Sequence, residues 1–260
     1  MPGTLPDQLL DKLWFYVAFD CNLSCRYCVA DAGPASRRPR IEIDTFRQLV
    51  DEASSIGFRQ ILISGGEPLL HPDILPMLQY SAARIDTVLL TNATLAGTPN
   101  FQGLGDLSGR RLSIQVSLDG AEPFFHDRWR GKGSWKRTVD GLSLLLQWGF
   151  DLSVRATLTE QSDAEIEQFY QFLEGCGIAR DKSYVARVAV GGRSQSGLQL
   201  EHPDLLPEVT LAADGLYTHP LKVDRSLAVT RTILPLLPAL EQLAEATAAP
   251  TPAGVPRRYR

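Results

Sequence analysis

Cys21, Cys25 and Cys28 lie within eight positions of one another near the start of the chain. The apolar stretch Leu13–Phe19 directly precedes them and is typical of a buried strand. Three thiolates can bind three irons of a four-iron cluster and leave the fourth iron open, whereas a closed cluster only passes electrons. The spacing therefore predicts an iron–sulfur site whose open iron can bind a substrate or a second cofactor.

A structural zinc site is the main alternative chemistry for these thiols. Zinc takes four ligands, usually from two well-separated pairs, and Cys176 has no nearby second cysteine. A catalytic thiol is disfavoured because three adjacent nucleophiles would be redundant. The histidines that could complete a zinc site are His71, His126, His202 and His219.

The composition limits the class of protein. The chain has 260 residues, 44% hydrophobic and 22% charged, which fits one globular domain with at most a small appendage. The net charge of -4 gives no electrostatic case for binding nucleic acid or an anionic membrane. We find no signal peptide and no apolar run long enough to cross a bilayer. Four cysteines, three of them within eight positions, do not resemble a disulfide framework and favour a cytoplasmic location.

Strand-like apolar runs alternate with amphipathic, helix-like stretches over most of the chain. This alternation predicts parallel βαβ units of right-handed sense. About six units form a partial (βα)6 TIM-like barrel, an α/β fold with its active site at the C-terminal ends of the strands. The expected strands are Leu13–Phe19, Gln60–Ser64, Thr87–Thr91, Leu112–Ser117, Leu152–Thr157 and Tyr184–Val190. The expected helices are Asp44–Ile56, Pro72–Ala83, Trp135–Trp148 and Ala164–Glu174.

The alternation stops near residue 200. Asp214-Gly215 between short apolar segments predicts a β-hairpin within Val209–Val223, and a helix is expected over Leu227–Ala246. The tail Thr247–Arg260, rich in Pro and Ala, is expected to be disordered. The predicted organisation is a lead-in at 1–12, the barrel at 13–200, the hairpin and helix at 201–246 and the tail at 247–260.

Polar motifs follow the predicted strands. Gly65-Gly66-Glu67 with Pro68 follows the second strand, where two glycines allow the backbone to approach a ligand and exposed N–H and C=O groups can bind a zwitterion. The alternative is a tight strand–helix turn. After the fourth strand the order is Ser117-Leu118-Asp119-Gly120, His126-Asp127, Arg130-Gly131 and Gly133-Ser134-Trp135.

Together these motifs resemble the radical S-adenosylmethionine (SAM) superfamily, from about Trp14 to Val190. The order after the fourth strand resembles its peptide-modifying, SPASM/twitch-related branch. The resemblance implies that Cys21, Cys25 and Cys28 bind one [4Fe–4S] cluster. Its open iron would be chelated by SAM, whose reductive cleavage gives a 5′-deoxyadenosyl radical.

The resemblance also implies which residues contact SAM. The segment Gly65-Gly66-Glu67, the glycine turn, would bind the methionyl ammonium of SAM. Arg130 would pair with the SAM carboxylate, and Arg128 is the alternative for this role. Arg155, inside the fifth strand, either reaches solvent or faces SAM or substrate at the barrel mouth. No catalytic side chain is singled out. The implied cofactor-binding residues are Gly65, Gly66, Glu67, Ser117, Asp119 and Arg130.

The chain departs from this branch in three places. No cysteine follows Cys176, and His219 stands where a twitch hairpin carries a cysteine, so we expect one cluster and a degenerate hairpin. Ala93 replaces a glycine after Thr91-Asn92. Because few residues precede the first strand, leader recognition is expected from a separate partner protein.

The expected function is modification of a precursor peptide or a protein by cross-linking, epimerisation or backbone excision, as in peptide spliceases. A flavodoxin or ferredoxin would donate the electron. The alternatives are a radical SAM dehydrogenase or decarboxylase acting on a small molecule, and a non-catalytic iron–sulfur binding protein.

Overall fold

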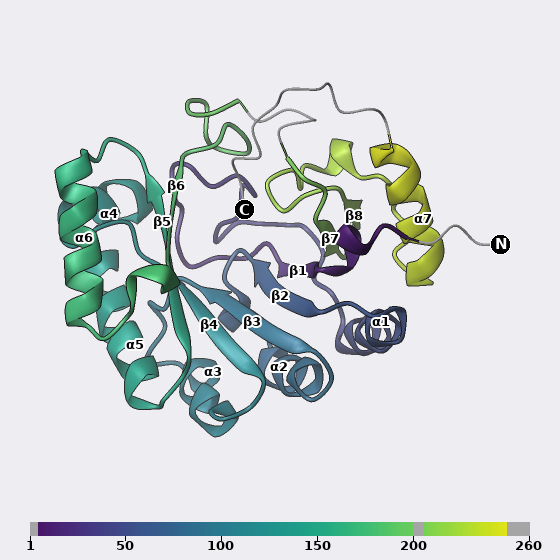
Figure 1. Ribbon diagram of the computed structural model, residues 1–260, viewed down its shortest axis with the longest axis horizontal. Helices are drawn as coiled ribbons and strands as arrows, with labels where there is room; N and C mark the ends of the chain where they lie inside the picture. Colours follow the sequence, from purple (N-terminus) through teal and green to yellow (C-terminus); the bar gives the residue numbers. More distant parts are fainter. Residues whose placement is uncertain (1–4, 200–204, 249–260) are drawn as a thin grey trace.

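A curved, open sheet of parallel strands forms the centre of the molecule (Figure 1). The computed structural model describes residues 5–199 and 205–248. The first six strands lie side by side in chain order, so the predicted partial barrel is confirmed. They are β1 (Lys12–Ala18), β2 (Gln60–Gly65), β3 (Asp86–Thr91), β4 (Leu112–Ser117), β5 (Leu152–Leu158) and β6 (Ser183–Arg187). The last of them ends before the expected Val190.

Helices follow most of these strands and cover the convex face of the sheet (Figure 1). The Ser162 side chain caps α6 in a reciprocal capping box with Glu165, which fixes where this helix begins. The short helices α3 and α4 were not expected from the sequence. The helices of the barrel are α1 (Ile43–Ile56), α2 (Ile74–Ala82), α3 (Pro99–Gln102), α4 (Pro123–Arg130), α5 (Ser134–Gln147) and α6 (Asp163–Gly175).

The two faces of the sheet differ in chemistry. Along β4, Leu112, Ile114 and Val116 are buried in the main core, whereas the alternate residues are only half-buried. On β5, Leu152, Val154 and Ala156 are likewise buried, whereas Arg155 between them is exposed. Because successive side chains of a strand point to opposite faces, the apolar set packs under the helices and the polar set faces the concave interior of the barrel.

The predicted hairpin extends the barrel sheet instead of standing apart from it. β7 (Val209–Ala212) pairs in parallel with β1, and β8 (Gly215–Tyr217) pairs antiparallel with β7. The sheet therefore has eight strands, with β1 lying between β2 and β7. Asp214 occupies the turn, as its sequence predicts.

The last helix is shorter than the sequence suggested. α7 spans Leu236–Thr247, so the expected start at Leu227 is wrong. Pro235 holds the chain extended directly before the helix, and a residue that precedes proline avoids the helical conformation. Thr247 belongs to α7, and residues 249–260 of the expected disordered tail lie outside the described residues.

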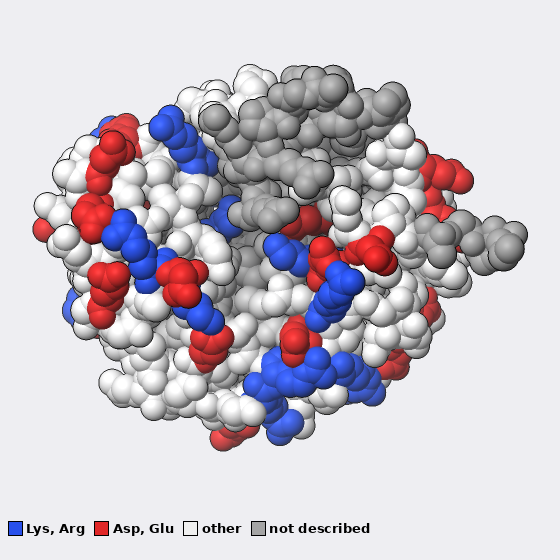
Figure 2. Space-filling model, viewed as in Figure 1, with Lys and Arg blue, Asp and Glu red and all other residues white. Residues whose placement is uncertain are grey.

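No helix in the described part of the chain is long and apolar enough to cross a membrane. On the face drawn in Figure 2, acidic and basic side chains are interspersed. Many charged side chains of the described residues form ion pairs, as in the Lys182–Asp151 contact of 3.0 Å. A mixed surface of this kind gives no broad positive field for nucleic acid. That the protein does not bind nucleic acid stays a prediction.

Candidate active site

The three cysteines lie on the loop that joins β1 to α1, at the C-terminal edge of the sheet. All three are free thiols. The backbone N–H of Leu23 donates to Cys21 Sγ at 3.4 Å, and that of Ala32 donates to Cys28 Sγ at 3.4 Å. Hydrogen bonds to sulfur tune iron–sulfur centres. The loop thus presents sulfur atoms that its own backbone already stabilises.

The surroundings of the thiols are apolar. Cys21 packs with Tyr16 and Phe19, and Cys25 and Cys28 border the same cluster. Burial raises the pKa of the Cys21 thiol to about 12 and also raises that of Cys25. In the absence of a metal, Cys21 and Cys25 therefore favour the protonated thiol.

The donor set of three thiols fits a multi-iron group, since each iron of such a cluster takes its own thiolate. Within residues 5–199 and 205–248, no three His, Cys, Asp or Glu side chains are grouped so that they could hold a metal ion. Zinc needs its ligands around one point, whereas each iron of a cluster takes its own thiolate.

Close backbone packing explains the two glycines at the end of β2. The N–H of Gly66 donates to the Ala18 carbonyl at 2.8 Å, and the N–H of Glu67 donates to the Asp20 carbonyl at 2.8 Å. A Cβ on Gly65 would lie 2.1 Å from the Ala18 oxygen, and one on Gly66 2.2 Å from the Asp20 oxygen. Larger residues are excluded at both positions because the turn packs directly against the backbone that begins the cysteine loop.

The Glu67 carboxylate is fully enclosed by protein. It accepts hydrogen bonds from Leu69 N at 3.1 Å, Thr91 Oγ1 at 2.9 Å and Asn92 N at 2.8 Å. Burial raises its pKa to about 7, against the effect of these three donors. The side chain therefore connects the ends of β2 and β3, and its contact with the methionyl ammonium stays a prediction.

The segment after β3 supports the cysteine loop from its other side. Asn92 Nδ2 donates to Asn22 Oδ1 at 3.0 Å and lies 4.0 Å from Cys21 Sγ. Ala93 adopts a left-handed conformation with φ of 55°, which suits glycine better than any other residue. This explains why glycine occupies the position in the motif that the chain resembles.

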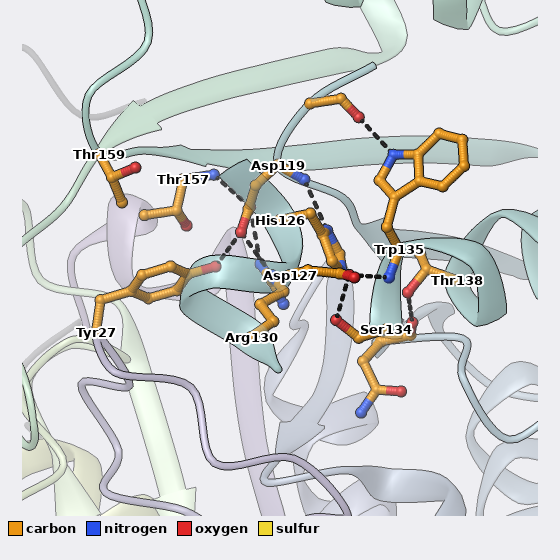
Figure 3. Close-up of polar contacts among 12 residues, drawn as sticks. Tyr27, Asp119, His126, Asp127, Arg130, Ser134, Trp135, Thr138, Thr157 and Thr159 are labelled. Atoms are coloured by element: carbon orange, nitrogen blue, oxygen red, sulfur yellow. Dashed lines mark hydrogen bonds and ion pairs between the residues drawn. The ribbon is translucent and has the colours of Figure 1, made fainter. Parts of the chain in front are cut away.

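Asp119, directly after β4, is the centre of a buried polar network (Figure 3). Arg130 donates to both of its carboxylate oxygens, from Nε at 2.7 Å and from Nη2 at 3.0 Å. The Tyr27 hydroxyl and the Thr157 N–H, the latter at 2.9 Å, donate to the same carboxylate. Burial opposes ionisation of Asp119, but the Arg130 guanidinium holds the pKa of this carboxyl below its usual value.

The remaining motif residues hold α4 and α5 in place around this centre (Figure 3). His126 Nδ1 accepts the Asp119 N–H at 3.2 Å, and burial lowers the pKa of His126 to about 4, so the ring is neutral. Asp127 accepts the N–H of Trp135 at 2.8 Å, and Trp135 Nε1 donates to the Gly120 carbonyl at 3.0 Å. The motif residues that follow β4, from Asp119 to Trp135, therefore form one connected hydrogen-bond network.

The structure places several of the predicted SAM-binding residues near one another. It also shows that some of their polar atoms already bind other protein groups. Ser117, Asp119 and Arg130 gather at the end of β4, but two nitrogens of Arg130 already bind Asp119. Pairing of Arg130 with the SAM carboxylate stays a prediction. Arg128, its alternative, is half-exposed and donates to Glu160 at 2.9 Å.

Tyr27 is a residue of this site to which the sequence assigned no contact. It is the aromatic residue before the last cysteine, and its hydroxyl connects the cysteine loop to Asp119. Its neighbour Arg26 donates its N–H to the Trp129 carbonyl of α4 at 2.9 Å. The aromatic position was visible in the sequence, but its partner could only come from the fold.

Residues 16–173 match the family model described as the Radical SAM superfamily. The chain belongs to the radical SAM superfamily. Enzymes of this superfamily use a [4Fe–4S] cluster and S-adenosylmethionine. The match covers the cysteine loop, the glycine turn and the Asp119 network, so the site described above is the part of the chain that carries the family signal.

Two curated relatives and one solved structure are similar to the chain. An AdoMet-dependent heme synthase from Methanosarcina barkeri is 31% identical over 60% of this chain and 45% of its own length. Mycofactocin maturase MftC from Mycolicibacterium smegmatis is 28% identical over 60% of this chain and 40% of its own. The chain thus spans less than half of either relative.

The solved structure is that of Streptococcus suis SuiB bound to S-adenosylmethionine. It superposes with a TM-score of 0.63 at 21% identity, over 73% of this chain and 44% of that one. At this identity the likeness establishes the fold alone, and it agrees with the open sheet described above.

Proposed function

We propose that this radical SAM enzyme modifies a peptide or protein substrate, using a single [4Fe–4S] cluster held by Cys21, Cys25 and Cys28. The observation that carries the proposal is the connected network around Asp119, whose residue order resembles that of the peptide-modifying branch. Similarity to a mycofactocin maturase supports the same substrate class. When bound, the cluster and SAM supply a 5′-deoxyadenosyl radical that removes a hydrogen atom from the substrate.

The protein's own part is to position these groups and exclude water. The glycine turn and Asn92 fix one side of the cysteine loop, and Tyr27 fixes the other side against Asp119. The apolar wall that includes Tyr16 and Phe19 buries Cys21 and partly covers Cys25 and Cys28. Shielding of this kind protects a reactive radical from competing hydrogen donors.

The SAM contacts are part of the same proposal. Gly65 and Gly66 would offer backbone groups to the methionyl part, while Ser117 and Arg130 would bind it from the end of β4. Their common position at the C-terminal ends of β2 and β4 supports this assignment, because loops at that edge carry the ligand sites of such barrels.

Anaerobic turnover tests the enzyme and its substrate separately. Reconstituted protein with dithionite and SAM should release 5′-deoxyadenosine, and a protein that releases none is a non-catalytic iron–sulfur protein. Co-expression with candidate precursor peptides, followed by mass spectrometry, should show a mass change or a cross-link. Peptides that stay unmodified, beside a protein that cleaves SAM, would contradict the peptide proposal.

Iron counting tests the ligand set. The wild type should bind about four irons per chain, as one four-iron cluster requires, and Cys25→Ala should lose the cluster. The matched control is Cys176→Ala, which removes a cysteine after α6 and should leave the iron content unchanged. A four-iron spectrum in Cys25→Ala would overturn the assignment.

A small-molecule substrate is the second candidate, and the similarity to an AdoMet-dependent heme synthase supports it. In that case the wild type would cleave SAM, leave every peptide unchanged and alter a small molecule in a cell extract. Either substrate class requires an electron donor, for which we propose a flavodoxin or a ferredoxin.

A further inference from the structure

Three exposed cations lie beside the cysteine loop and have no counter-ion. Arg26 is on the loop itself, directly after Cys25, while Lys132 precedes α5 and Arg137 lies in the first turn of that helix. None of the three forms an ion pair within residues 5–199 and 205–248. We call Arg26, Lys132 and Arg137 the basic patch.

Direct contacts bring these three cations to one place. The N–H of Arg26 donates to the Trp129 carbonyl, near the end of α4, at 2.9 Å. Lys132 follows three residues later, in the short turn between α4 and α5. The Arg137 guanidinium folds back over the same turn, since a Cβ on Gly133 would lie 3.8 Å from Arg137 Nη1. The basic patch therefore surrounds one turn, against which the cysteine loop packs.

The acidic side chains of this region are already engaged. Asp127 accepts two backbone N–H groups at the start of α5, at 2.6 and 2.8 Å. Asp140 pairs with Lys136 at 2.7 Å, and Glu160 pairs with Arg128 at 2.9 Å. Asp127 therefore offsets at most one of the three charges, and the basic patch keeps an excess of positive charge.

The stability of α5 does not account for Arg137. The N-terminus of a helix carries a partial positive charge, so that acidic residues are favourable in its first turn and cations are not. The first turn of α5 contains no acidic residue. The field of the helix therefore adds to that of the basic patch.

The charge of the basic patch is opposite to that of the whole chain, which has a net charge of -4. An acidic protein is repelled by such a molecule on average and attracted where positive charge gathers. Complementary charge of this kind speeds association and fixes the orientation of the partner. An acidic partner would therefore meet the chain at the cysteine loop.

The position of Arg26 indicates what this partner does. Arg26 follows Cys25, and consecutive Cα atoms are about 3.8 Å apart. Cys25 itself is only partly covered by protein. A partner on the basic patch would thus lie next to a proposed cluster ligand. Because the rate of electron transfer falls steeply with distance, this position suits a protein that reduces the cluster.

We infer that the basic patch docks the acidic face of a one-electron donor protein of the flavodoxin or ferredoxin class. The inference rests on the proposed function, which needs such a donor, and deepens it by assigning the surface that the donor binds. One electron passes from the reduced donor to the bound cluster. The donor is oxidised and the cluster is reduced by that electron, and no bond or proton is transferred.

Binding to the reconstituted holoenzyme tests the surface directly. The probe is a flavodoxin of acidic isoelectric point, titrated anaerobically by calorimetry. Lys132→Gln combined with Arg137→Gln should weaken binding about fivefold at low salt, as loss of two exposed charge pairs predicts. The difference should vanish at about 0.5 M salt, where such charges are screened. Arg26 is kept, because a change beside Cys25 alters the surroundings of the cluster.

The matched control is Arg110→Gln combined with Arg231→Gln. This double variant removes two exposed cations that also form no ion pair within the described residues, before β4 and after β8, and changes the net charge by the same amount. It should bind the flavodoxin like the wild type. Equal affinities in the two double variants would overturn the inference.

Carbodiimide cross-linking locates the contact without any substitution. The Lys132 ammonium should form an amide with a carboxylate of the flavodoxin, which mass spectrometry of the digested complex identifies. The exposed lysines Lys12 and Lys182 lie on other elements and serve as references. Cross-links at these two residues alone would overturn the inference.

Reduction of the cluster separates docking from redox chemistry. With reduced flavodoxin, the Lys132, Arg137 double variant should bleach the cluster absorbance more slowly than the wild type. With photoreduced 5-deazaflavin, a small uncharged reductant, both should bleach at the same rate. A variant that is slow with both reductants has an altered cluster, and this result would count against a docking role.

The outcomes also separate this inference from the proposed function. If a Glu-rich peptide, and not the flavodoxin, depended on Lys132 and Arg137 for binding, the donor inference would fail and the surface would belong to a substrate. If the flavodoxin bound as expected but neither reductant gave 5′-deoxyadenosine, the surface would stand and the proposed function would fail.

Discussion

The cysteine loop is held on two sides by networks of the same composition. On one side Arg130 binds both oxygens of Asp119 and Tyr27 donates to the same carboxylate. On the other side Arg38 binds both oxygens of Asp214, at 3.0 and 2.9 Å, and Tyr217 donates to it at 2.9 Å. Each network joins one residue of the loop to a distant element, α4 in the first case and the β7–β8 turn in the second.

The two networks differ in their surroundings. The Arg130 and Asp119 side chains are 9% and 2% exposed, and one arginine balances the carboxylate. Asp214 has a second arginine, Arg225, at 3.3 Å with a side chain that is 57% exposed. The first network therefore depends on each member, whereas the second can lose one cation and still have another. This difference suggests that the Asp119 side fixes the active site and the Asp214 side tethers the hairpin.

Removal of Arg130 should have the largest effect. Arg130→Met leaves the buried Asp119 carboxylate without its counter-ion and should reduce the free energy of unfolding by about 3–5 kcal/mol. Chemical denaturation monitored by circular dichroism measures it. The double variant Asp119→Asn, Arg130→Met should recover part of the loss, and Arg128→Met is the exposed control. A loss below about 1 kcal/mol in Arg130→Met would show that the pair contributes little.

Removal of Arg38 should have a smaller effect. In Arg38→Gln the charge of Asp214 is still balanced by Arg225, so we expect a loss of about 1.5–3 kcal/mol from the hydrogen bonds to a charged acceptor. Arg225→Gln should cost under about 1 kcal/mol, since exposed pairs contribute little. If Arg38→Gln destabilised the protein as much as Arg130→Met, the two networks would not differ as described.

The two tyrosines test the comparison at the level of a single hydroxyl. Tyr27→Phe should lower the free energy of unfolding by about 2 kcal/mol, and Tyr217→Phe by about 1 kcal/mol, because the acceptor of Tyr27 is more deeply buried. Tyr27→Phe should also loosen the cysteine loop and slow the release of 5′-deoxyadenosine. Equal effects on turnover in both variants would contradict the assignment of the Asp119 side to the active site.

The dependence of stability on acid pH is expected to show the smallest of these effects. Burial opposes ionisation in both cases, but Arg130 holds the pKa of Asp119 below its usual value of 3.8, and Arg38 does the same for Asp214. Each carboxylate therefore stabilises the fold above about pH 3.8, and this stabilisation is lost as the pH falls through the lowered value. Asp119→Asn should flatten the decline of stability below pH 3.8, as measured by urea titrations from pH 2 to 5. An unchanged slope would show that Asp119 does not titrate there.

The sequence predicted the elements better than their partners. β4 lies where expected, at Leu112–Ser117, because alternating side chains reveal a half-buried strand. The turn at Asp214 was also predicted from local chemistry. The predicted start of α7 was wrong because the apolar run before Pro235 was included in the helix, although the proline disfavours a helical residue before it.

The sequence alone did not predict which distant residues contact each other in the fold. The motif named Asp119 and Arg130 separately, but only the return of α4 over the end of β4 makes them a pair. Similarly, nothing local to Glu67 indicates that β3 supplies its hydrogen-bond donors. The three cysteines needed no such information, since they are close together in the chain itself.

The parallel pairing of β1 with β7 has a consequence for biosynthesis. Leu13 at the start of β1 pairs with Val209, so the strand that leads into the cysteine loop obtains its second neighbour only when nearly the whole described chain has been made. At ordinary rates of translation, the cysteine loop of the nascent chain therefore lacks the support of β7 for roughly ten seconds or more. Iron loading should therefore follow translation, and oxidative stress during synthesis should damage the protein more than the same stress applied to the finished fold.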